Sequence, residues 1–277
     1  MKTFASLFSG REGAEMGAIA TGLKPIWGIE LEPKIAEVAA VNVGHQLIVK
    51  SIDRVNINRL ERPDILWASP PCQAFSCARS KKLEARCDAD IGLAIISYLS
   101  ILQPSYFFLE NVEGYRHSSV FCDIVDNLYK LGYWTNWDVL NAADFGVPQT
   151  RRRLILRAVK GGFVPALPQK ERWVGWYEAI ADLIPTLPET EFAPWQLCRM
   201  PELKRTSIVD AHNTSREATI RDGESPVHCL TVGGLNRPGT IPKAFLIGDN
   251  SHRQPLKQSG RGFLNSQIRV PVSLAVY

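Results

Sequence analysis

The chain has 277 residues, of which 45% are hydrophobic and 22% are charged, and it carries a formal net charge of +4. This composition is typical of a globular protein and excludes wholesale disorder. No apolar run approaches the ~18 residues of a membrane-spanning helix. The apolar run Phe4–Phe8 is interrupted by Ser9-Gly10-Arg11-Glu12, so it cannot serve as the core of a signal peptide. We therefore expect a cytoplasmic protein with no membrane partner.

The six cysteines are expected to be reduced thiols, because disulfide frameworks are rare in the cytoplasm. Cysteines that bind zinc normally come as closely spaced pairs, often with histidine. Cys72, Cys77 and Cys87 are irregularly spaced with no histidine nearby. We therefore predict no metal site.

The excess positive charge lies in the last third of the chain. Residues 195–277 contain 11 Lys and Arg against 6 Asp and Glu, whereas residues 1–194 contain 21 against 22. A basic segment rich in glycine and proline fits contact with a polyanion such as nucleic acid. On charge alone, a solvated tail fits equally well.

The first 165 residues alternate between strand-like and helix-like segments. Strands are expected at Thr3–Phe8, Pro25–Glu30, Leu47–Ser51, Asp64–Ala68, Ser105–Leu109, Trp134–Leu140 and Arg153–Ala158. Helices are expected at Ala14–Ala20, Pro33–Asn42, Ile91–Leu102 and Val120–Leu131. Such alternation predicts an α/β domain with a doubly wound, mostly parallel sheet covered on both faces.

Residues 166–277 form a different, loop-rich region with frequent prolines. Short strands are expected there at Cys229–Val232 and Ala244–Ile247 at most. We therefore place a boundary between two domains, residues 1–165 and residues 166–277.

Glycine and acidic residues follow the first two predicted strands. Ser9-Gly10 comes after the first strand, and Glu30 ends the second. In a parallel sheet, ligands bind at the carboxyl ends of the strands. Glycine lets the backbone approach a ligand closely, and a carboxylate can accept hydrogen bonds from ribose hydroxyls. These residues predict a nucleotide site, although a glycine turn can also be purely structural.

Cys72 follows two prolines after the fourth predicted strand. Pro70-Pro71 stops the strand and holds the next residues rigidly. A cysteine on such a turn is a candidate nucleophile once it is a thiolate. The alternative, from this residue alone, is an inert buried thiol.

Two later motifs supply charge. Glu110 follows the apolar strand Ser105–Leu109, where partial desolvation lets a carboxyl group hold or donate a proton; the alternative is a helix-capping acid. Gln149, Arg151 and Arg153 share one face if their segment is extended. That face suits an anion or a polar base edge, although it can equally be a plain basic patch.

Together these motifs resemble those of one family, the DNA (cytosine-5) methyltransferases of prokaryotic type. The order and spacing match at Phe8-Ser9-Gly10, Glu30, Pro71-Cys72-Gln73, Glu110-Asn111-Val112, Asn141–Pro148 and Gln149–Arg153. The similarity covers residues 3–160.

This resemblance implies S-adenosyl-L-methionine as the cofactor, double-stranded DNA as the partner, and a nucleoid-associated protein of a restriction-modification system. The implied catalytic residues are Cys72, Glu110, Arg151 and Arg153. The implied cofactor-binding residues are Phe8, Ser9, Gly10, Gly13, Glu30, Leu31, Asp53 and Pro71. The implied DNA-binding residues are Gln73, Ser76, Lys81, Lys82, Arg86 and Gln149. Several of the latter lie on a segment, Phe75–Asp90, that would close over DNA, and residues 166–277 would recognise the target sequence.

The implied reaction is methylation of cytosine C5 on a base flipped out of the duplex. The Cys72 thiolate would add to C6, and Glu110 would engage the N3/N4 edge and supply the proton. Arg151 or, by family analogy mainly, Arg153 would steady the ring. C5 would then accept the methyl group, and Cys72 would be released. The alternatives are an RNA cytosine-5 methyltransferase and a non-catalytic DNA-binding relative.

The chain departs from the family pattern in two places. Glu12 stands where the family usually has a second glycine. The family's Leu-Thr-x-Arg-Glu motif and final Gly-Asn motif do not occur before Tyr277. Three explanations stay open at this point: a second subunit supplies these motifs, the chain is a fragment, or it works as it stands.

Overall fold

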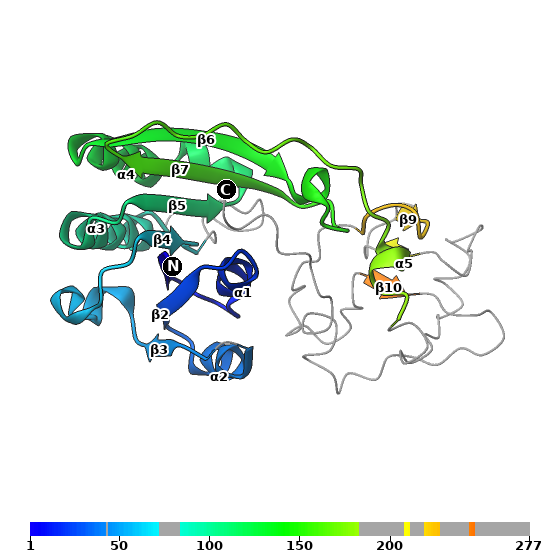
Figure 1. The fold of residues 1–277 in the computed structure, drawn as a ribbon, viewed down its shortest axis with the longest axis horizontal. Helices are drawn as coiled ribbons and strands as arrows, with labels where there is room; N and C mark the ends of the chain where they lie inside the picture. The colour runs from blue at the N-terminus through cyan, green and yellow to red at the C-terminus, as the bar shows by residue number, and fades with distance from the viewer. Residues whose placement is uncertain (43, 72–83, 183–207, 211–218, 228–243, 247–277) are drawn as a thin grey trace. The chain divides into compact units, whose positions relative to one another are not determined.

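The computed structural model describes residues 1–42, 44–71, 84–182, 208–210, 219–227 and 244–246 (Figure 1). These residues form two compact units. The first contains the described residues of Met1–Leu140 and Arg152–Gln169. The second contains Asn141–Arg151 and the described residues from Lys170 onward.

A seven-stranded sheet forms the centre of the first unit, in the order β3-β2-β1-β4-β5-β7-β6 (Figure 1). The strands are β1 (Thr3–Leu7), β2 (Lys24–Glu30), β3 (Gln46–Val49), β4 (Ile65–Ala68), β5 (Tyr106–Asn111), β6 (Tyr133–Asn141) and β7 (Arg152–Lys160). The five strands from β3 to β5 are parallel, and β7 runs antiparallel to β5. The predicted α/β class with a mostly parallel sheet is confirmed.

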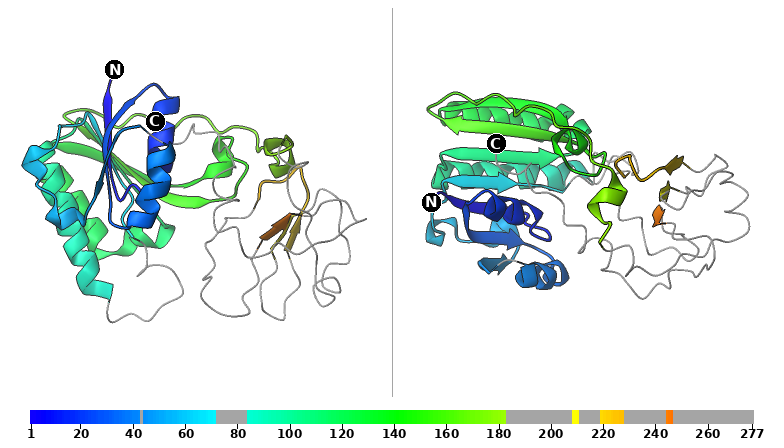
Figure 2. Two further views of the ribbon diagram at one scale, coloured as in Figure 1. Left: turned by 90° about the horizontal axis from the view of Figure 1, so that it is seen from below. Right: turned by 45° about the vertical axis from the view of Figure 1, so that its right-hand side comes forward.

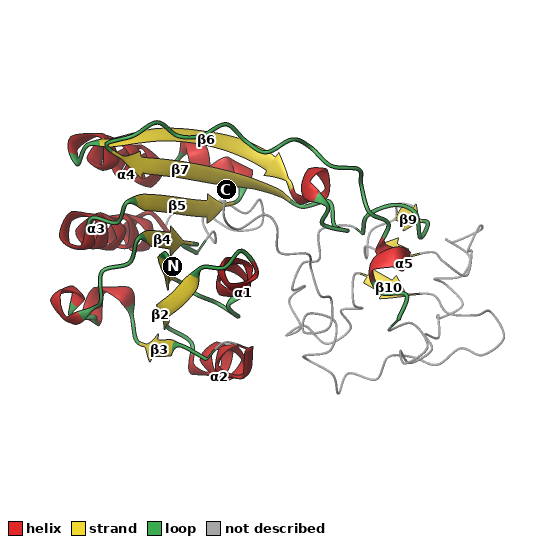
Figure 3. Ribbon diagram, in the orientation of Figure 1, coloured by secondary structure: helices red, strands yellow, loops and turns green. Residues whose placement is uncertain are grey.

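Helices follow β1, β2, β4 and β5 along the chain (Figure 3). They are α1 (Gly13–Ala20), α2 (Pro33–Asn42), α3 (Glu84–Leu102) and α4 (Ser119–Lys130), with 3-10 turns at Ile52–Arg54, Ile57–Arg59, Glu113–His117 and Ala142–Phe145. Within the described part of the chain, no helix is both long and apolar enough to span a membrane.

The alternation of side chains along the strands builds two hydrophobic clusters, one on each face of the sheet. Ala5 and Leu7 of β1 belong to a large cluster with α3 and α4. Phe4 of β1 instead belongs to a smaller cluster with Ala18 of α1. Because successive strand residues point to opposite faces, α1 covers one face while α3 and α4 cover the other. Figure 2 shows helices on both sides of the sheet.

Three predicted segments need comment. The predicted loop Phe75–Asp90 is helical from Glu84 onward, so Arg86 belongs to α3 and not to a loop. The sequence there, Glu84-Ala85-Arg86, consists of strong helix formers, which continue the apolar helix expected from Ile91. The predicted strand Cys229–Val232 lies outside the described residues, whereas the strand expected at Ala244–Ile247 is present as β10 (Ala244–Leu246).

The second unit contains a small antiparallel sheet in the order β10-β8-β9, with β8 at Ile208–Asp210 and β9 at Thr219–Arg221. It also contains the short helix α5 (Trp176–Ala179), which the sequence pattern did not predict. The buried Trp176 donates its backbone N–H to Ser225 O at 3.1 Å, so this helix is held by a turn distant in sequence.

A reciprocal polar contact joins the start of β1 to the start of β4. Asp64 accepts from the backbone N–H and the hydroxyl of Thr3 at 2.7 and 2.9 Å, and the N–H of Asp64 donates to that hydroxyl at 2.9 Å. The Thr3 N–H, followed by the Thr3 hydroxyl, holds the pKa of Asp64 below its usual value. The ionised carboxylate is therefore the form that stabilises the fold.

We expect Asp64→Asn to lower the free energy of unfolding at pH 7 by about 0.5–1 kcal/mol, a modest loss because the contact is partly exposed. A depressed folded-state pKa contributes stability above the unfolded pKa of about 4, and this contribution is lost as the pH falls. Urea unfolding at pH 7, 5 and 3 should show the gap between variant and wild type closing at acidic pH. A gap independent of pH would contradict this assignment. The exposed Asp123→Asn is the control.

Candidate cofactor and catalytic site

The predicted site residues of the first unit lie where its parallel strands end. From β1 the chain proceeds outward to β2 and β3, and it then returns to β4 and β5 on the other side of β1. This reversal between β1 and β4 is the topological switch point at which open α/β sheets bind ligands. The N–H of Ser69, just after β4, donates to Leu7 O at the end of β1 at 3.2 Å. The two segments that flank the switch point are thus directly bonded.

The turn after β1 is built from left-handed backbone. Phe8, Gly10 and Glu12 have φ angles of 60°, 59° and 66°. Left-handed backbone is free of strain only for glycine. The turn is anchored because the Ser9 N–H donates to Ile29 O of β2 at 2.9 Å. The predicted glycine turn therefore forms, and it leads directly into α1.

Glu30 holds this turn in place. One carboxylate oxygen accepts from the Gly10 N–H at 2.8 Å, and the other accepts from the Glu32 N–H at 2.9 Å. Glu30 is only 9% exposed, so water does not readily replace these bonds. A carboxylate offers about four acceptor positions, so two remain for hydroxyl groups of a ligand. The carboxylate can therefore position the turn and also bind a ribose.

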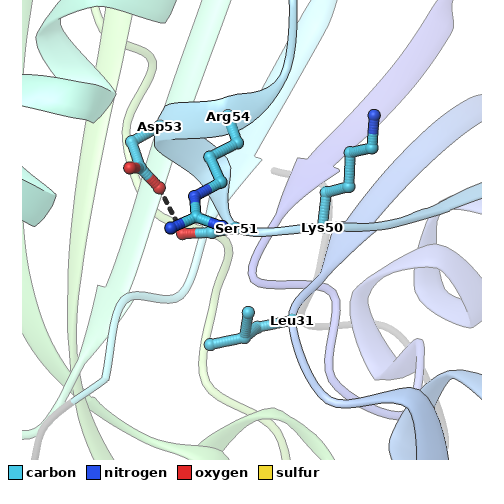
Figure 4. A pocket seen from close by; sticks show the side chains of 5 residues that line it. All are labelled: Leu31, Lys50, Ser51, Asp53 and Arg54. Atoms are coloured by element: carbon cyan, nitrogen blue, oxygen red, sulfur yellow. Dashed lines mark hydrogen bonds between the residues drawn. The ribbon is translucent and has the colours of Figure 1, made fainter.

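An open cavity of ≈ 540 Å³ is lined by residues that follow β2 and β3 in the chain (Figure 4). Its lining residues are Leu31, Lys50, Ser51, Asp53 and Arg54. The structure thus brings together Leu31 and Asp53, two of the residues predicted to bind cofactor. The Ser51 hydroxyl donates to the Asp53 carboxylate, and this bond lowers the pKa of Asp53. The volume falls within the usual range of small-molecule sites.

Asn111 fixes the proline turn that precedes Cys72. Its amide Nδ2 donates to Pro70 O at 3.1 Å, and the residue is 2% exposed. The end of β5 thereby holds Pro70-Pro71, with Pro71 itself exposed. We did not predict a positioning role for Asn111; the amide directly after Glu110 was the available signal. The predicted residues Cys72, Gln73, Ser76, Lys81 and Lys82 lie outside the described residues.

Glu110 and Arg153 form an ion pair across β5 and β7. Arg153 Nε lies 2.8 Å from Glu110 Oε1, and both side chains are about one-fifth exposed, at 21% and 22%. The neighbouring Arg152 is 66% exposed and pairs with Glu113 at 3.1 Å. Arg153 is therefore the arginine of β7 that orients the candidate acid.

Gln149 and Arg151 belong to the second unit. The Arg151 N–H donates to the side-chain oxygen of Asn141 at 3.0 Å, and the Thr150 N–H donates to Val227 O at 2.8 Å. Gln149 forms an isolated bridge with Val227, and β7 begins only at Arg152. Of the three residues expected to share one face if extended, only Arg153 lies within β7, and the shared face stays a prediction.

Three buried titratable residues lie below the turn after β1, on the side of α1. Burial, and secondarily the charge of Glu15, raises the pKa of Glu12 to about 8. Burial raises the pKa of Glu15 to about 7, and it lowers the pKa of His45. We did not predict this cluster, because Glu12 and His45 are distant in sequence and no local pattern connects them.

The parallel sheet, the glycine turn after β1 and the acid at the carboxyl rim are features of a Rossmann-like fold. The family model of the C-5 cytosine-specific DNA methylases matches residues 2–232. The chain therefore belongs to this family.

Curated relatives agree with this family. The chain is 29% identical over 199 residues to the Type II methyltransferase M1.HphI of Haemophilus parahaemolyticus, covering 68% of this chain and 53% of the relative. It is 31% identical over 169 residues to the Type II methyltransferase M.NlaIV of Neisseria lactamica, covering 55% and 40%. The chain thus spans about half of these relatives or less.

Solved structures share the fold. A putative DNA modification methyltransferase encoded within an E. coli prophage has a TM-score of 0.56 at 20% identity, covering 69% of this chain and 57% of that one. The methyltransferase EhMeth of Entamoeba histolytica has a TM-score of 0.55 at 22% identity, covering 65% and 59%.

We expect Glu30→Gln to destabilise the protein even without cofactor. A carboxamide offers one acceptor oxygen where two backbone N–H groups donate, so its NH₂ group faces a donor and leaves it unpaired, at a cost of about 1–3 kcal/mol. Urea unfolding without ligand measures this loss. Glu32→Gln, an exposed neighbour, should change stability by less than about 0.5 kcal/mol. Equal stability of wild type and Glu30→Gln would show that Glu30 does not hold the turn.

Proposed function

We propose that this chain methylates C5 of cytosine in a specific double-stranded DNA sequence, through a covalent bond between Cys72 and C6 of a flipped-out base. Residues 1–165 would bind S-adenosyl-L-methionine and carry out the reaction, and residues 166–277 would recognise the DNA. The observation that carries the proposal is the ion pair between Glu110 of β5 and Arg153 of β7. The residue after Glu110, Asn111, bonds the turn before Cys72.

The described residues fit an adenosyl cofactor. Glu30 keeps acceptor positions for ribose hydroxyls, and the cavity after β2 and β3 offers Asp53 as an acceptor for an adenine amine and Leu31 as an apolar wall. Phe8 would stack near the adenine, and Gly10 would pass the methionine end. Ser9, Gly13 and Pro71 would complete the cofactor site. S-adenosylmethionine would supply an electrophilic methyl group at this site.

The protein residues would make C5 nucleophilic. C5 of cytosine is too weak a nucleophile by itself, and addition of the Cys72 thiolate to C6 moves electron density onto it. Glu110 would hold a proton at N3 during this addition, and Arg153 would keep the carboxyl group in place. After C5 takes the methyl group, it loses its proton, and the electrons of that C–H bond expel the thiolate. Arg151 would contribute positive charge beside the base.

The DNA contacts are expected from basic and amide side chains of both units. Gln73, Ser76, Lys81, Lys82 and Arg86 follow Cys72 and would contact the flipped base's strand, chiefly its phosphates. Gln149 would contact DNA from the second unit, where its backbone bridge to Val227 fixes its position.

The cofactor assignment predicts a specific loss of affinity. We expect Asp53→Asn to weaken S-adenosylmethionine binding about tenfold, because the charged acceptor and its bond from Ser51 are altered together. Isothermal titration calorimetry measures the dissociation constant. Glu61→Gln removes an exposed carboxylate outside the cavity and should leave it unchanged. Equal affinities for all three proteins would remove Asp53 from the site.

The covalent step is tested by trapping on duplex DNA of mixed sequence that carries 5-fluorocytosine, in the presence of S-adenosyl-L-methionine as methyl donor. Fluorine cannot leave as a proton does, so an active chain stays attached to the DNA and shifts on a denaturing gel. We expect an adduct for the wild type and for Cys122→Ser, which removes an exposed thiol, and none for Cys72→Ser.

The same assay tests the ion pair. Arg153→Gln should slow trapping about 100-fold, whereas Arg152→Gln should have little effect because that side chain is mostly exposed. An adduct that persists in Cys72→Ser would overturn the proposed nucleophile. An adduct on 5-fluorocytosine RNA but not on DNA would overturn the proposed substrate.

A further inference from the structure

Glu12, Glu15 and His45 form a compact buried cluster. Glu12 ends the turn after β1, Glu15 lies in the first turn of α1, and His45 precedes β3. Each side chain offers one candidate ligand atom, and these three atoms all lie within 4.8 Å of one another. Glu15 is fully buried, Glu12 is 1% exposed, and the His45 side chain is 6% exposed. Three segments of the first unit therefore direct oxygen and nitrogen donors to one interior point.

Most of these candidate ligand atoms have no hydrogen-bond partner among the described residues. They are both carboxylate oxygens of Glu12, one oxygen of Glu15 and both ring nitrogens of His45. The other oxygen of Glu15 accepts from the Ser6 hydroxyl, so one of its contacts is satisfied. Burying a polar group without a partner is costly, and burying a charged one is more so. The cluster thus has the arrangement of a site whose ligand is missing.

A divalent cation fits this donor set in charge and chemistry. Two carboxylates and a neutral imidazole with a doubly charged ion give a cluster of zero net charge. Carboxylate oxygen and imidazole nitrogen are ligands of Zn²⁺ and its neighbours in the first transition row. Glu12 Oε1 and His45 Nε2 are 3.4 Å apart. In a tetrahedral site with bonds of about 2.0–2.1 Å, adjacent ligand atoms are separated by about the same distance.

A shared proton satisfies the cluster less well. A protonated Glu12 could donate to His45, but at 3.4 Å this bond is weak and it leaves the second Glu12 oxygen, the free Glu15 oxygen and His45 Nδ1 unpaired. Glu12 also keeps the left-handed φ of 66°, which glycine adopts without strain.

We propose that Glu12, Glu15 and His45 bind one divalent transition-metal ion, which ties the turn after β1 to the segment before β3. The ion is structural and does not depend on the methyltransfer reaction. It binds Glu12 at the end of the turn after β1, whereas Glu30 binds the Gly10 N–H of the same turn. This proposal differs from our prediction of no metal site, which considered only cysteine ligands.

The test is Zn²⁺ binding to the full chain after dialysis against a chelator. We expect one equivalent per chain by elemental analysis, and a rise in melting temperature on adding Zn²⁺. Glu12→Gly, Glu15→Gln and His45→Gln should each weaken Zn²⁺ binding by about 100-fold or more. Glu12→Gly is the decisive variant, because glycine suits the backbone at this position and the protein should fold at least as stably as the metal-free wild type.

Two controls separate this site from other ligands. His117→Gln removes an exposed histidine and Cys122→Ser an exposed thiol, and both should keep the bound equivalent. Co²⁺ as a substitute probe should give visible absorption without the charge-transfer band of thiolate ligation. Equal Zn²⁺ stoichiometry in wild type and Glu12→Gly, a thiolate band, or no uptake by the depleted wild type would each overturn the proposal.

Discussion

The carboxylate of Glu30 is the contact on which the cofactor side of the site depends. Its two oxygens accept from Gly10 and Glu32, so a single side chain joins the turn after β1 to the segment after β2. The turn needs such support because its left-handed backbone has no regular helical or strand bonding of its own. Glu30 also faces the position where ligands of parallel sheets bind. The same carboxylate therefore holds the site together and offers acceptors to what binds there.

Two consecutive residues of β5, Glu110 and Asn111, make different contacts. Successive strand side chains point to opposite faces, so Glu110 and Asn111 cannot occupy the same environment. Asn111 is buried and bonds the proline turn, whereas Glu110 is partly exposed and meets Arg153. The pairing of β5 with β7 brings Arg153 to this position. The end of β5 therefore contacts both Arg153 of β7 and the turn before Cys72.

Glu12 stands where the family usually has a second glycine, and its side chain is buried. Its carboxylate does not line the cavity formed after β2 and β3; it is directed inward, with Oε1 only 3.3 Å from the position that a Cβ on Gly28 would occupy. Gly28 of β2 leaves room for three polar side chains, because a Cβ there would lie 2.5 Å from Ser9 Oγ and 3.2 Å from Ser6 Oγ as well. The substitution therefore changes the interior beneath the turn and keeps the left-handed backbone on which the turn depends.

Local patterns in the sequence determined the class of fold and the residues after each strand. Apolar runs alternating with helical segments identified β1 to β7, and Ser9-Gly10, Glu30, Pro70-Pro71 and Glu110 could be placed at strand ends because strand periodicity and turn residues act over a few positions. Only the tertiary structure decided the contacts between distant segments: Asn111 with Pro70, Glu110 with Arg153, and Glu12 with His45. These pairs depend on strand order and register, which side-chain periodicity does not encode. The contacts of each polar side chain are therefore determined by tertiary packing and not by its neighbours in the sequence.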